Sequence, residues 1–330
     1  MALRTRLTEM LGIKHPIISA PMAFAAGGNL AAAVTVSGGL GLIGGGYGDA
    51  EWLERQFSEA RNARVGCGFI TWSLAKQPRL LDLVLAHSPS AVMLSFGSPT
   101  PYVGRIKAAG ATMICQVQSM EHAREAVSAG ADVIVAQGAE AGGHGMARAT
   151  MTLVPELADY LVKAAPTTRL VAAGGIADGR GLAAALMLGA DGVLIGSRFW
   201  ASSEALVNFA FQKVALAADG DSTIRTTVVD VARKIEWPNP FTARVMKNRF
   251  IEEWHGREAE LAKPEVVDRE MHRYMTAMQS GDPDNTGVWV GEATGLMHDV
   301  QPAGDLLQKI AGDAERLLGD KAPGFVSMRS

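Results

Sequence analysis

The sequence is poor in cysteine and in aromatic residues, with two cysteines and 6% Phe, Trp and Tyr in 330 residues. Cys67 and Cys115 lie in apolar, strand-like segments, so we expect two buried, reduced thiols, and their spacing does not suit a metal-ligand pair. The sequence contains no run of about 18 apolar residues, and its N-terminus lacks the apolar core of a signal peptide. These absences predict a soluble protein of the cytoplasm with no membrane association.

An excess of basic charge is also missing. The 31 Lys and Arg residues and the 34 Asp and Glu residues give a formal net charge of -3, with a pI near 6.2. Such a balance supplies no basic surface for nucleic acid. The histidines show no H-E-x-x-H spacing, and we expect no metal site. The predicted partner is therefore a small molecule, and the sequence leaves the oligomeric state open.

Glycine, alanine and short apolar runs are abundant. The 37 glycines and the hydrophobic share of 48% suit a chain in which strands and helices alternate and pack closely. Eight apolar runs recur with Ala-rich stretches between them, at residues 16–22, 40–43, 65–70, 91–95, 112–116, 132–135, 170–173 and 193–195. Near-continuous apolar runs are typical of parallel strands covered by helices. Eight such units predict an α/β fold, a closed (β/α)₈ barrel of the TIM type.

The alternation of strands and helices stops near residue 200, which predicts three parts. We expect residues 1–203 to form the barrel, residues 204–280 to form a smaller helical cap beside its C-terminal mouth, and residues 281–330 to return to the barrel. The cap is expected to consist of helices interrupted by a loop at 236–240. An amphipathic stretch at 303–318 belongs to the returning part.

Two glycine-bearing turns follow the last two predicted barrel strands. Gly174-Gly175 ends the seventh strand and Gly196-Ser197 ends the eighth, and a helix is expected to begin after each. In (β/α)₈ barrels these two loops commonly bind phosphate, because glycine lets the backbone approach and helix starts present free N–H groups. Ordinary tight turns are the alternative. Two such loops in adjacent units at the matching strands favour a phosphate site.

His144 follows the sixth predicted strand in a glycine-rich loop. Gly142, Gly143 and Gly145 flank it and remove side chains that would block a ligand. An imidazole can take or give a proton near neutral pH, so His144 is the candidate general acid or base. The other histidines are expected to have surface or packing roles, namely His15, His87, His122, His255, His272 and His298.

Three further features have more than one interpretation. Residues 39–44 match the dinucleotide pattern G-x-G-x-x-G, but the apolar part of the match is itself the strand, so we do not expect a nucleotide fingerprint. Glu140 either supplies a catalytic carboxylate or caps backbone N–H groups of its own loop. Ser95, Gln116 and Gln137 end strands on the predicted active face, where they could hydrogen-bond a ligand.

The residues around His144 resemble the nitronate monooxygenase family, once called 2-nitropropane dioxygenases, and its FMN-dependent enoyl-ACP reductase relatives. The likeness covers nearly the whole chain. It rests on His15-Pro-Ile-Ile-Ser-Ala-Pro-Met22, Gly38-Gly-Leu-Gly-Leu-Ile-Gly, Val135-Ala-Gln-Gly-Ala-Glu-Ala-Gly-Gly-His144, Ala172-Ala-Gly-Gly-Ile-Ala-Asp-Gly179 and Leu188-Gly-Ala-Asp-Gly-Val-Leu-Ile-Gly-Ser197. Asn248-Arg-Phe-Ile-Glu-Glu253 and Ala20-Pro21-Met22 resemble the monooxygenases more than the reductases.

The resemblance implies FMN as cofactor and His144 as catalytic base. The implied FMN contacts are Ala20, Pro21, Met22, Gly68, Gln116, Gln137, Gly138, Gly142, Gly143, Ala173, Gly174, Gly175, Ile195, Gly196 and Ser197, with Trp289 and Gly291 closing on the flavin from the returning segment. The chain departs from the family pattern at Gly68, where many relatives have Asn, at Gln116, where some have Lys, and at Met146, where Gly is common. A missing Lys removes a positive charge that would stabilise the reduced flavin ring.

Three functions follow, in order of preference. The first is an FMN-dependent nitronate monooxygenase that oxidises alkyl nitronates, or nitroalkanes after His144 removes their α-proton, with O2 to carbonyl compounds and nitrite. The second is an FMN-dependent reductase of enoyl thioesters or quinones that takes hydride from NAD(P)H. The third is a barrel that binds a phosphorylated ligand without turnover.

Overall fold

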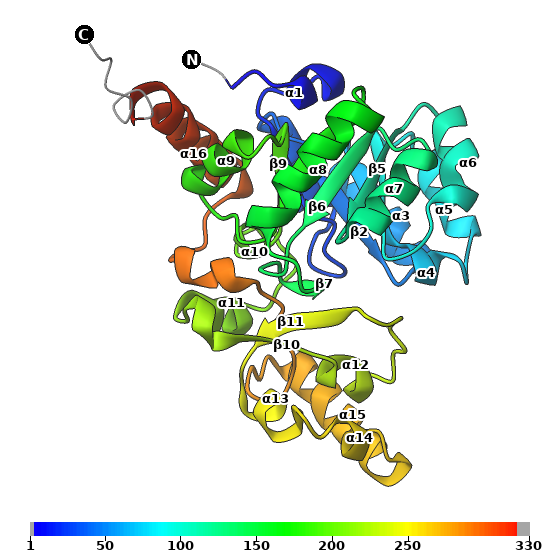
Figure 1. Ribbon diagram of the computed structural model, residues 1–330. Coiled ribbons are helices and arrows are strands. Elements are labelled where there is room, and N and C mark those ends of the chain that lie inside the picture. The colour runs from blue at the N-terminus through cyan, green and yellow to red at the C-terminus, as the bar shows by residue number, and fades with distance from the viewer. Residues whose placement is uncertain (1–2, 322–330) are drawn as a thin grey trace.

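The computed structural model describes residues 3–321 and contains a barrel of eight parallel strands (Figure 1). The strands follow the order β1-β9-β8-β6-β5-β4-β3-β2, and an isolated parallel bridge between Ile18 and Leu40 joins the two edges. Their bounds are β1 Ile17–Ser19, β2 Leu42–Gly46, β3 Gly66–Ile70, β4 Ala91–Ser95, β5 Thr112–Val117, β6 Val133–Gln137, β8 Arg169–Ala173 and β9 Gly192–Ile195. The predicted (β/α)₈ barrel is confirmed.

The predicted strands differ most from the observed ones at β1 and β2. The first run was expected to continue to Met22, but β1 ends at Ser19 because Pro21 has no N–H to donate and the chain turns, with the Met22 N–H donating to the Ala20 carbonyl. The second strand begins two residues later than expected and extends to Gly46, because its glycines pair with β3.

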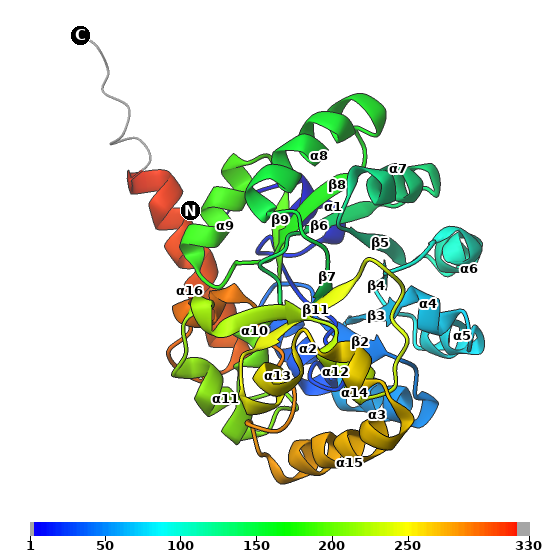
Figure 2. The same ribbon diagram turned by 60° about the horizontal axis from the view of Figure 1, so that its bottom comes forward.

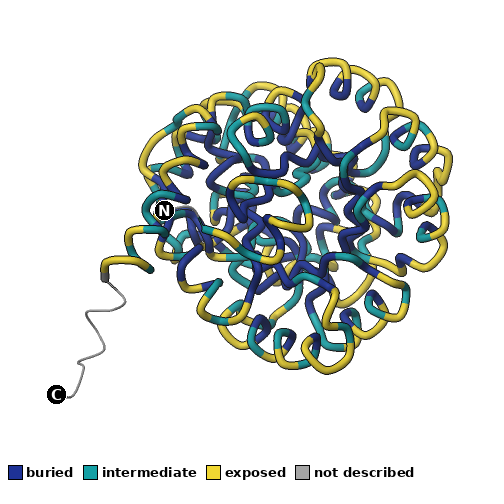
Figure 3. The backbone as a smooth tube through the Cα atoms, turned by 90° about the horizontal axis from the view of Figure 1, so that it is seen from above, coloured by how far each residue is buried: buried dark blue, intermediate teal, exposed yellow. Residues whose placement is uncertain are grey.

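Helices cover the outside of the barrel, with exposed residues facing outward (Figure 3). They are α2 Gly28–Val36, α3 Ala50–Ala60, α4 Thr71–Leu74, α5 Arg79–Ala86, η1 Thr100–Tyr102, α6 Val103–Ala108, α7 Met120–Ser128, α8 Thr150–Ala164, α9 Gly179–Met187 and α16 Ala303–Arg316, followed by η4 Leu317–Lys321. Asp49, Ser119 and Asp178 accept backbone N–H bonds as N-caps and set the starts of α3, α7 and α9. The amphipathic α16 packs against α9 and α2 and so takes the place of the eighth barrel helix.

Two apolar layers make up the barrel core. Side chains such as Met93, Ile114 and Val135 fill the inside, and Leu7 of α1 (Arg6–Leu11) packs against them. The outer layer lies between the strands and the helices, and both cysteines are in it. The two thiols are free and buried, as expected. Burial raises the pKa of both thiols, that of Cys115 to about 12, so each stays protonated at neutral pH.

The chain between β9 and α16 forms a second layer across one end of the barrel (Figures 1 and 2). It contains α10 Ser197–Trp200, α11 Phe209–Leu216, η2 Gly220–Ser222, β10 Thr223–Thr226, α12 Val228–Ala232, β11 Thr242–Met246, α13 Arg249–Trp254, α14 Glu258–Leu261, α15 Pro264–Ser280 and η3 Glu292–Leu296. We refer to residues 204–280 as the cap.

The cap is not wholly helical, which corrects the sequence expectation. β10 and β11 pair antiparallel, and β11 also pairs with β7 (Gly143–Gly145), a short strand in the loop after β6. Among the described residues, β10 pairs only with β11, whereas the other partner of β11, β7, lies about 100 residues earlier in the chain, so a local sequence pattern does not show that pairing. The boundaries at residues 203 and 280 stay predictions, and residues 322–330 of the predicted returning part lie outside the described residues. Within residues 3–321, no helix is long and apolar enough to cross a membrane.

Candidate active site

A cavity of about 450 Å³ lies at the C-terminal ends of the barrel strands, under the cap. Strand ends and the loops that follow them form its floor, which is where (β/α)₈ enzymes place their active sites. The cap contributes Arg233, Trp237 and Met278, and the returning segment contributes Trp289. Apolar side chains form most of the wall, so a bound ligand would be largely shielded from water.

The structure places most of the predicted site residues around this one cavity. The lining includes His144 and, among the expected FMN contacts, Ala20, Pro21, Met22, Gly68, Gln116, Gln137, Gly142, Gly143, Ala173, Gly174, Gly175, Gly196, Ser197, Trp289 and Gly291. Gly138 and Ile195 do not line it. Ile195 faces the outer core layer and is fully buried there. Gly138 packs beside Thr150, and its N–H donates to the Ala173 carbonyl.

The ends of β8 and β9 form what we call the glycine cradle, made of Gly174, Gly175, Gly196 and Ser197. None of their four backbone N–H groups donates a hydrogen bond to another of the described residues. Gly174 and Gly175 have φ values of 103° and 72°, which turn their peptides in a way that residues with a Cβ rarely adopt. Unpaired N–H groups of this kind bind anions, because each would otherwise remain unsatisfied on burial.

Gly196 of the cradle and Gly143 nearby leave space for a flat ligand. A Cβ at Gly143 would meet nothing within 4 Å, and one at Gly196 would come no closer than 3.7 Å to Ala20. Gly68 differs, since a Cβ there would lie 2.3 Å from the Pro21 ring. A side chain at position 68 would therefore require Pro21 to move.

A chain of amide side chains holds the loop that carries His144. Gln137 donates from Nε2 to the His144 carbonyl at 3.0 Å, and its Oε1 accepts from Gln118 at 2.8 Å and from Gln116 at 3.2 Å. Gln137 therefore acts on the position of His144 as well as lining the cavity. Gln118, which the sequence pattern did not single out, is fully buried behind it.

His144 lies on β7 and its ring is held by a carboxylate from the cap. Its Nε2 lies 3.0 Å from both carboxylate oxygens of Asp230, and the two side chains are 7% and 5% exposed. Burial lowers the pKa of His144 below its usual 6.5, although Asp230 acts in the opposite direction. The ring is therefore neutral at neutral pH, with its Nε2–H donating to Asp230. Its other nitrogen, Nδ1, then carries a free lone pair, and no described residue hydrogen-bonds it.

Aromatic rings surround this histidine. The His144 ring stacks on Trp237 with a centroid distance of 3.4 Å and an interplanar angle of 9°. The Phe96 ring packs edge-on against it with a centroid distance of 6.4 Å, and the Trp289 ring lies tilted beside it with a centroid distance of 5.6 Å. This packing fixes the plane of the imidazole, because the hydrogen bond to Asp230 alone would not prevent the ring from rotating.

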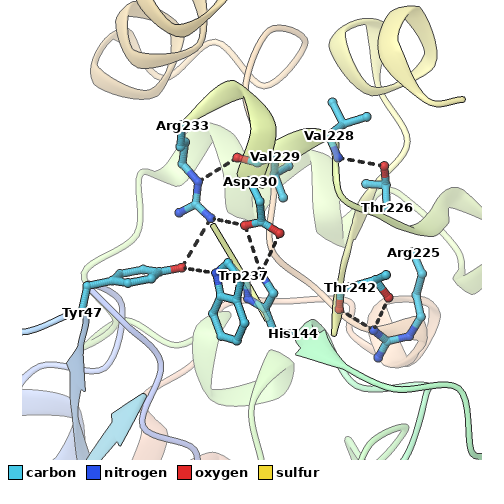
Figure 4. A network of polar contacts seen from close by, with 10 residues as sticks. All are labelled: Tyr47, His144, Arg225, Thr226, Val228, Val229, Asp230, Arg233, Trp237 and Thr242. Atoms are coloured by element: carbon cyan, nitrogen blue, oxygen red, sulfur yellow. Dashed lines mark hydrogen bonds and ion pairs between the residues drawn. The ribbon is translucent and has the colours of Figure 1, made fainter. Parts of the chain in front are cut away.

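A polar network extends from Asp230 to the barrel (Figure 4). Arg233 donates from Nη2 to Asp230 at 2.9 Å and approaches the Tyr47 hydroxyl at 3.5 Å. The Tyr47 oxygen also accepts from Trp237 Nε1 at 3.0 Å. Burial opposes the charge of Arg233, but Tyr47, Tyr274 and Asp230 outweigh it and hold its pKa above the usual value. Arg233 therefore stays protonated.

Glu140 has a structural partner. Its carboxylate accepts from the Thr150 N–H at 3.0 Å and from the Thr150 hydroxyl at 2.9 Å, at the start of α8. Of the two interpretations left open by the sequence, these bonds support the capping role. The Glu140 carbonyl also accepts from the Glu292 N–H at 2.9 Å, which ties the returning segment to this loop.

Asp230, Arg233, Trp237 and Tyr47 were not found from the sequence. Asp230 is 86 residues from His144, and no motif connects them. One signal was present, namely an acidic residue within the apolar run Val228-Val-Asp-Val-Ala232. A buried carboxylate in such a run requires a partner. The sequence does not show which partner, because Arg225, Arg233 and His144 could each have paired with this carboxylate.

A closed barrel whose polar side chains gather at the C-terminal strand ends has the architecture of a barrel enzyme. Comparison with known proteins agrees. A family model described as nitronate monooxygenase matches residues 4–66 and 62–313. The chain is 33% identical to a nitronate monooxygenase of Neurospora crassa, over 92% of this chain and 90% of the relative.

Two solved structures superpose on nearly the whole chain. FabK from Thermotoga maritima superposes with a TM-score of 0.84 at 31% identity, over 98% of this chain and all of the other. A nitroalkane oxidase from Streptomyces ansochromogenes superposes with a TM-score of 0.78 at 25% identity, again over 98% of this chain and 100% of the other. The chain therefore belongs to the nitronate monooxygenase family and is an oxidoreductase.

Proposed function

We propose that the protein is an FMN-dependent nitronate monooxygenase that converts alkyl nitronates, and the nitroalkanes from which they form, to carbonyl compounds and nitrite with O2. The observation that carries the proposal is the His144–Asp230 pair at a cavity that the glycine cradle also lines. A base held in one tautomer, beside a site for a phosphorylated cofactor, suits proton removal from carbon followed by oxidation.

The residues of the cavity fit FMN. The glycine cradle offers four unpaired N–H groups to its phosphate. The space beside Gly143 and Gly196, bounded by Ala20 and Pro21, would take the flat ring system. Bound FMN would supply the acceptor for the substrate's electrons and would pass them to O2. Gln116 occupies the position where some relatives place a lysine, so this chain offers the flavin an amide and no charge there.

His144 has the properties of a general base. Its pKa is lowered by burial, so the neutral ring is present at neutral pH. A nitroalkane α-proton would move to Nδ1, and the imidazolium that forms would be stabilised by Asp230 through Nε2–H. The stacked Trp237 keeps the ring in the plane needed for this transfer.

Replacement of His144 tests the assignment. His144→Asn should reduce turnover of neutral nitroalkanes by about 10²–10⁴-fold, since that is the usual contribution of a general base, and should spare preformed nitronates. Nitrite release from each substrate, with flavin content as the control, is the measurement. Equal losses on both substrates would remove His144 from the base role.

The likeness to FabK favours a second candidate, an NAD(P)H-dependent reductase of enoyl thioesters or quinones with the same cofactor. Anaerobic mixing with NADH and NADPH separates the two. Rapid bleaching of the flavin supports the reductase, whereas no bleaching together with nitrite release from a nitronate supports the monooxygenase. The third function, a barrel that binds without turnover, receives no support from a family of enzymes. A cytoplasmic location stays a prediction.

A further inference from the structure

Arg233 is the only Lys or Arg among the described residues that line the cavity. Its side chain is 14% exposed and leaves the C-terminal end of α12, next to the carboxylate that holds His144. Nε donates to the Val229 carbonyl at 2.9 Å, and Nη2 is engaged with Asp230 and Tyr47. Nη1 donates to none of the described residues. A protonated guanidinium thus keeps an unused donor group at the cavity.

Tyr47 offers a second unused donor beside the first. Its hydroxyl oxygen accepts from Trp237 Nε1 and lies within reach of Arg233 Nη2, so both of its lone pairs face donors. The phenol proton must then point elsewhere, and no acceptor for it occurs among the described residues. Figure 4 shows the Tyr47 hydroxyl, the Arg233 guanidinium and the His144 ring converging from three separate segments.

We propose that Arg233 and Tyr47 form an anion anchor, in which Arg233 Nη1 and the Tyr47 hydroxyl each bind one oxygen of a planar, two-oxygen anionic group and so direct its neighbouring carbon toward His144. The identity of that group as a nitronate rests on the proposed function. The anchor itself rests on the two unused donors, their common position at the cavity and the charge of Arg233. It makes both residues determinants of specificity for anions over neutral molecules of the same shape.

Binding of an unreactive pair of ligands tests the anchor without turnover. Butyrate carries the two-oxygen anion, and butanamide has nearly the same shape without the charge. Calorimetric titration of the flavin-loaded protein with each should show preference for butyrate. Tyr47→Phe should weaken the binding of butyrate about tenfold, and Arg233→Met should weaken it about a hundredfold, because hydrogen bonds to charged groups are stronger than those between neutral groups. Butanamide affinity should change by less than about threefold in both variants.

Tyr47→Phe is the decisive variant, because Arg233 also contacts Asp230 whereas the Tyr47 hydroxyl does not. Lys234→Met is the matched control. It removes a positive charge from the next residue, whose ammonium pairs with Asp268 on the exposed face and does not line the cavity. This control should bind butyrate as the parent protein does.

Steady-state kinetics give a second readout. With a nitronate substrate, Tyr47→Phe should raise KM about tenfold and change kcat by less than about threefold, as expected for lost uniform binding. Unchanged butyrate affinity in Tyr47→Phe and Arg233→Met would overturn the anchor. Variants that lost affinity for FMN but not for butyrate would also overturn it. If the anchor behaves as expected but no nitronate is turned over, the proposed function fails and the anchor stands.

Discussion

The cavity presents backbone N–H groups to a ligand at the ends of β8 and β9, but it presents side chains where the cap meets the barrel. We call this second region, with His144, Asp230, Arg233 and Tyr47, the seam. The glycine cradle comes from two adjacent strand ends of one barrel. The His144–Asp230 pair joins β7 to α12, and Arg233 and Tyr47 extend it to the loop after β2. Backbone donors are fixed once the barrel closes, but the side-chain network requires the cap to dock correctly. The two ends should therefore respond differently to mutation.

The largest expected effect is at the seam. Asp230→Asn retains the shape of the side chain but removes the charge that stabilises a protonated His144. Turnover of neutral nitroalkanes should fall by about a thousandfold, within the range of general base catalysis. FMN affinity should stay within about twofold, because Asp230 does not belong to the cradle. A parallel loss of FMN would mean that the two ends are coupled.

The reciprocal change blocks the cradle. Gly196 has a φ of −100°, so Gly196→Val introduces side-chain atoms beside the unpaired N–H groups without left-handed strain. FMN affinity should fall by about a hundredfold, equivalent to the loss of one or two charge-assisted hydrogen bonds. Gly104→Val is the control, since a Cβ at Gly104 meets nothing within 4 Å in α6. Fluorescence titration with FMN measures both, and circular dichroism with thermal melts checks that the barrel is intact.

The pH dependence of nitroalkane turnover should depend on the His144–Asp230 pair at the seam and not on the cradle. A base must be deprotonated to act, and burial lowers the pKa of His144 from 6.5. The rate with neutral nitroalkanes should thus be flat well above the lowered pKa and fall about tenfold per pH unit below it. Asp230→Asn should shift this fall to lower pH, because Asp230 raises the pKa of His144. An acid limb centred above pH 6.5 would contradict the buried, neutral ring.

Folding stability should follow the same titration. Between pH 6.5 and the lowered pKa, His144 is protonated in the unfolded chain but not in the folded chain. The free energy of unfolding therefore decreases as pH falls through this window. His144→Asn should reduce the slope of stability against pH there. Urea unfolding at several pH values measures it, and an unchanged slope would place the titration on another group.

The smallest effect is expected for Trp237→Phe. The ring stacked on His144 is kept in part, but the indole N–H bond to Tyr47 is lost. Nitroalkane turnover should fall about threefold, in keeping with one neutral hydrogen bond of about 0.5–1.5 kcal/mol. FMN affinity should not change. A loss as large as that of Asp230→Asn would show that the stack, more than the carboxylate, positions the imidazole.

Most of the barrel and one end of the site could be predicted from the sequence, because local patterns determine them. Buried parallel strands are continuous apolar runs, and the last two of them end in glycines at the position where the fold binds phosphate. His144 was found for a similar reason, since glycines on both sides leave it open. Ile195 shows the limit of such patterns, since it lies within a site motif but its side chain faces the outer core.

Only the tertiary structure decided what His144 is bonded to and how its ring is held. Asp230 and Trp237 lie about 90 residues downstream, in the segment between β10 and β11, and β11 joins the barrel by pairing with β7. Pairing energy of this kind comes from the partner strand and does not appear in the local composition of either segment. The sequence thus determined the barrel, the cradle and the candidate base, whose local conformations are nearly independent of distant residues. Docking of the cap onto β7 determined the tautomer, the charge and the surroundings of that base.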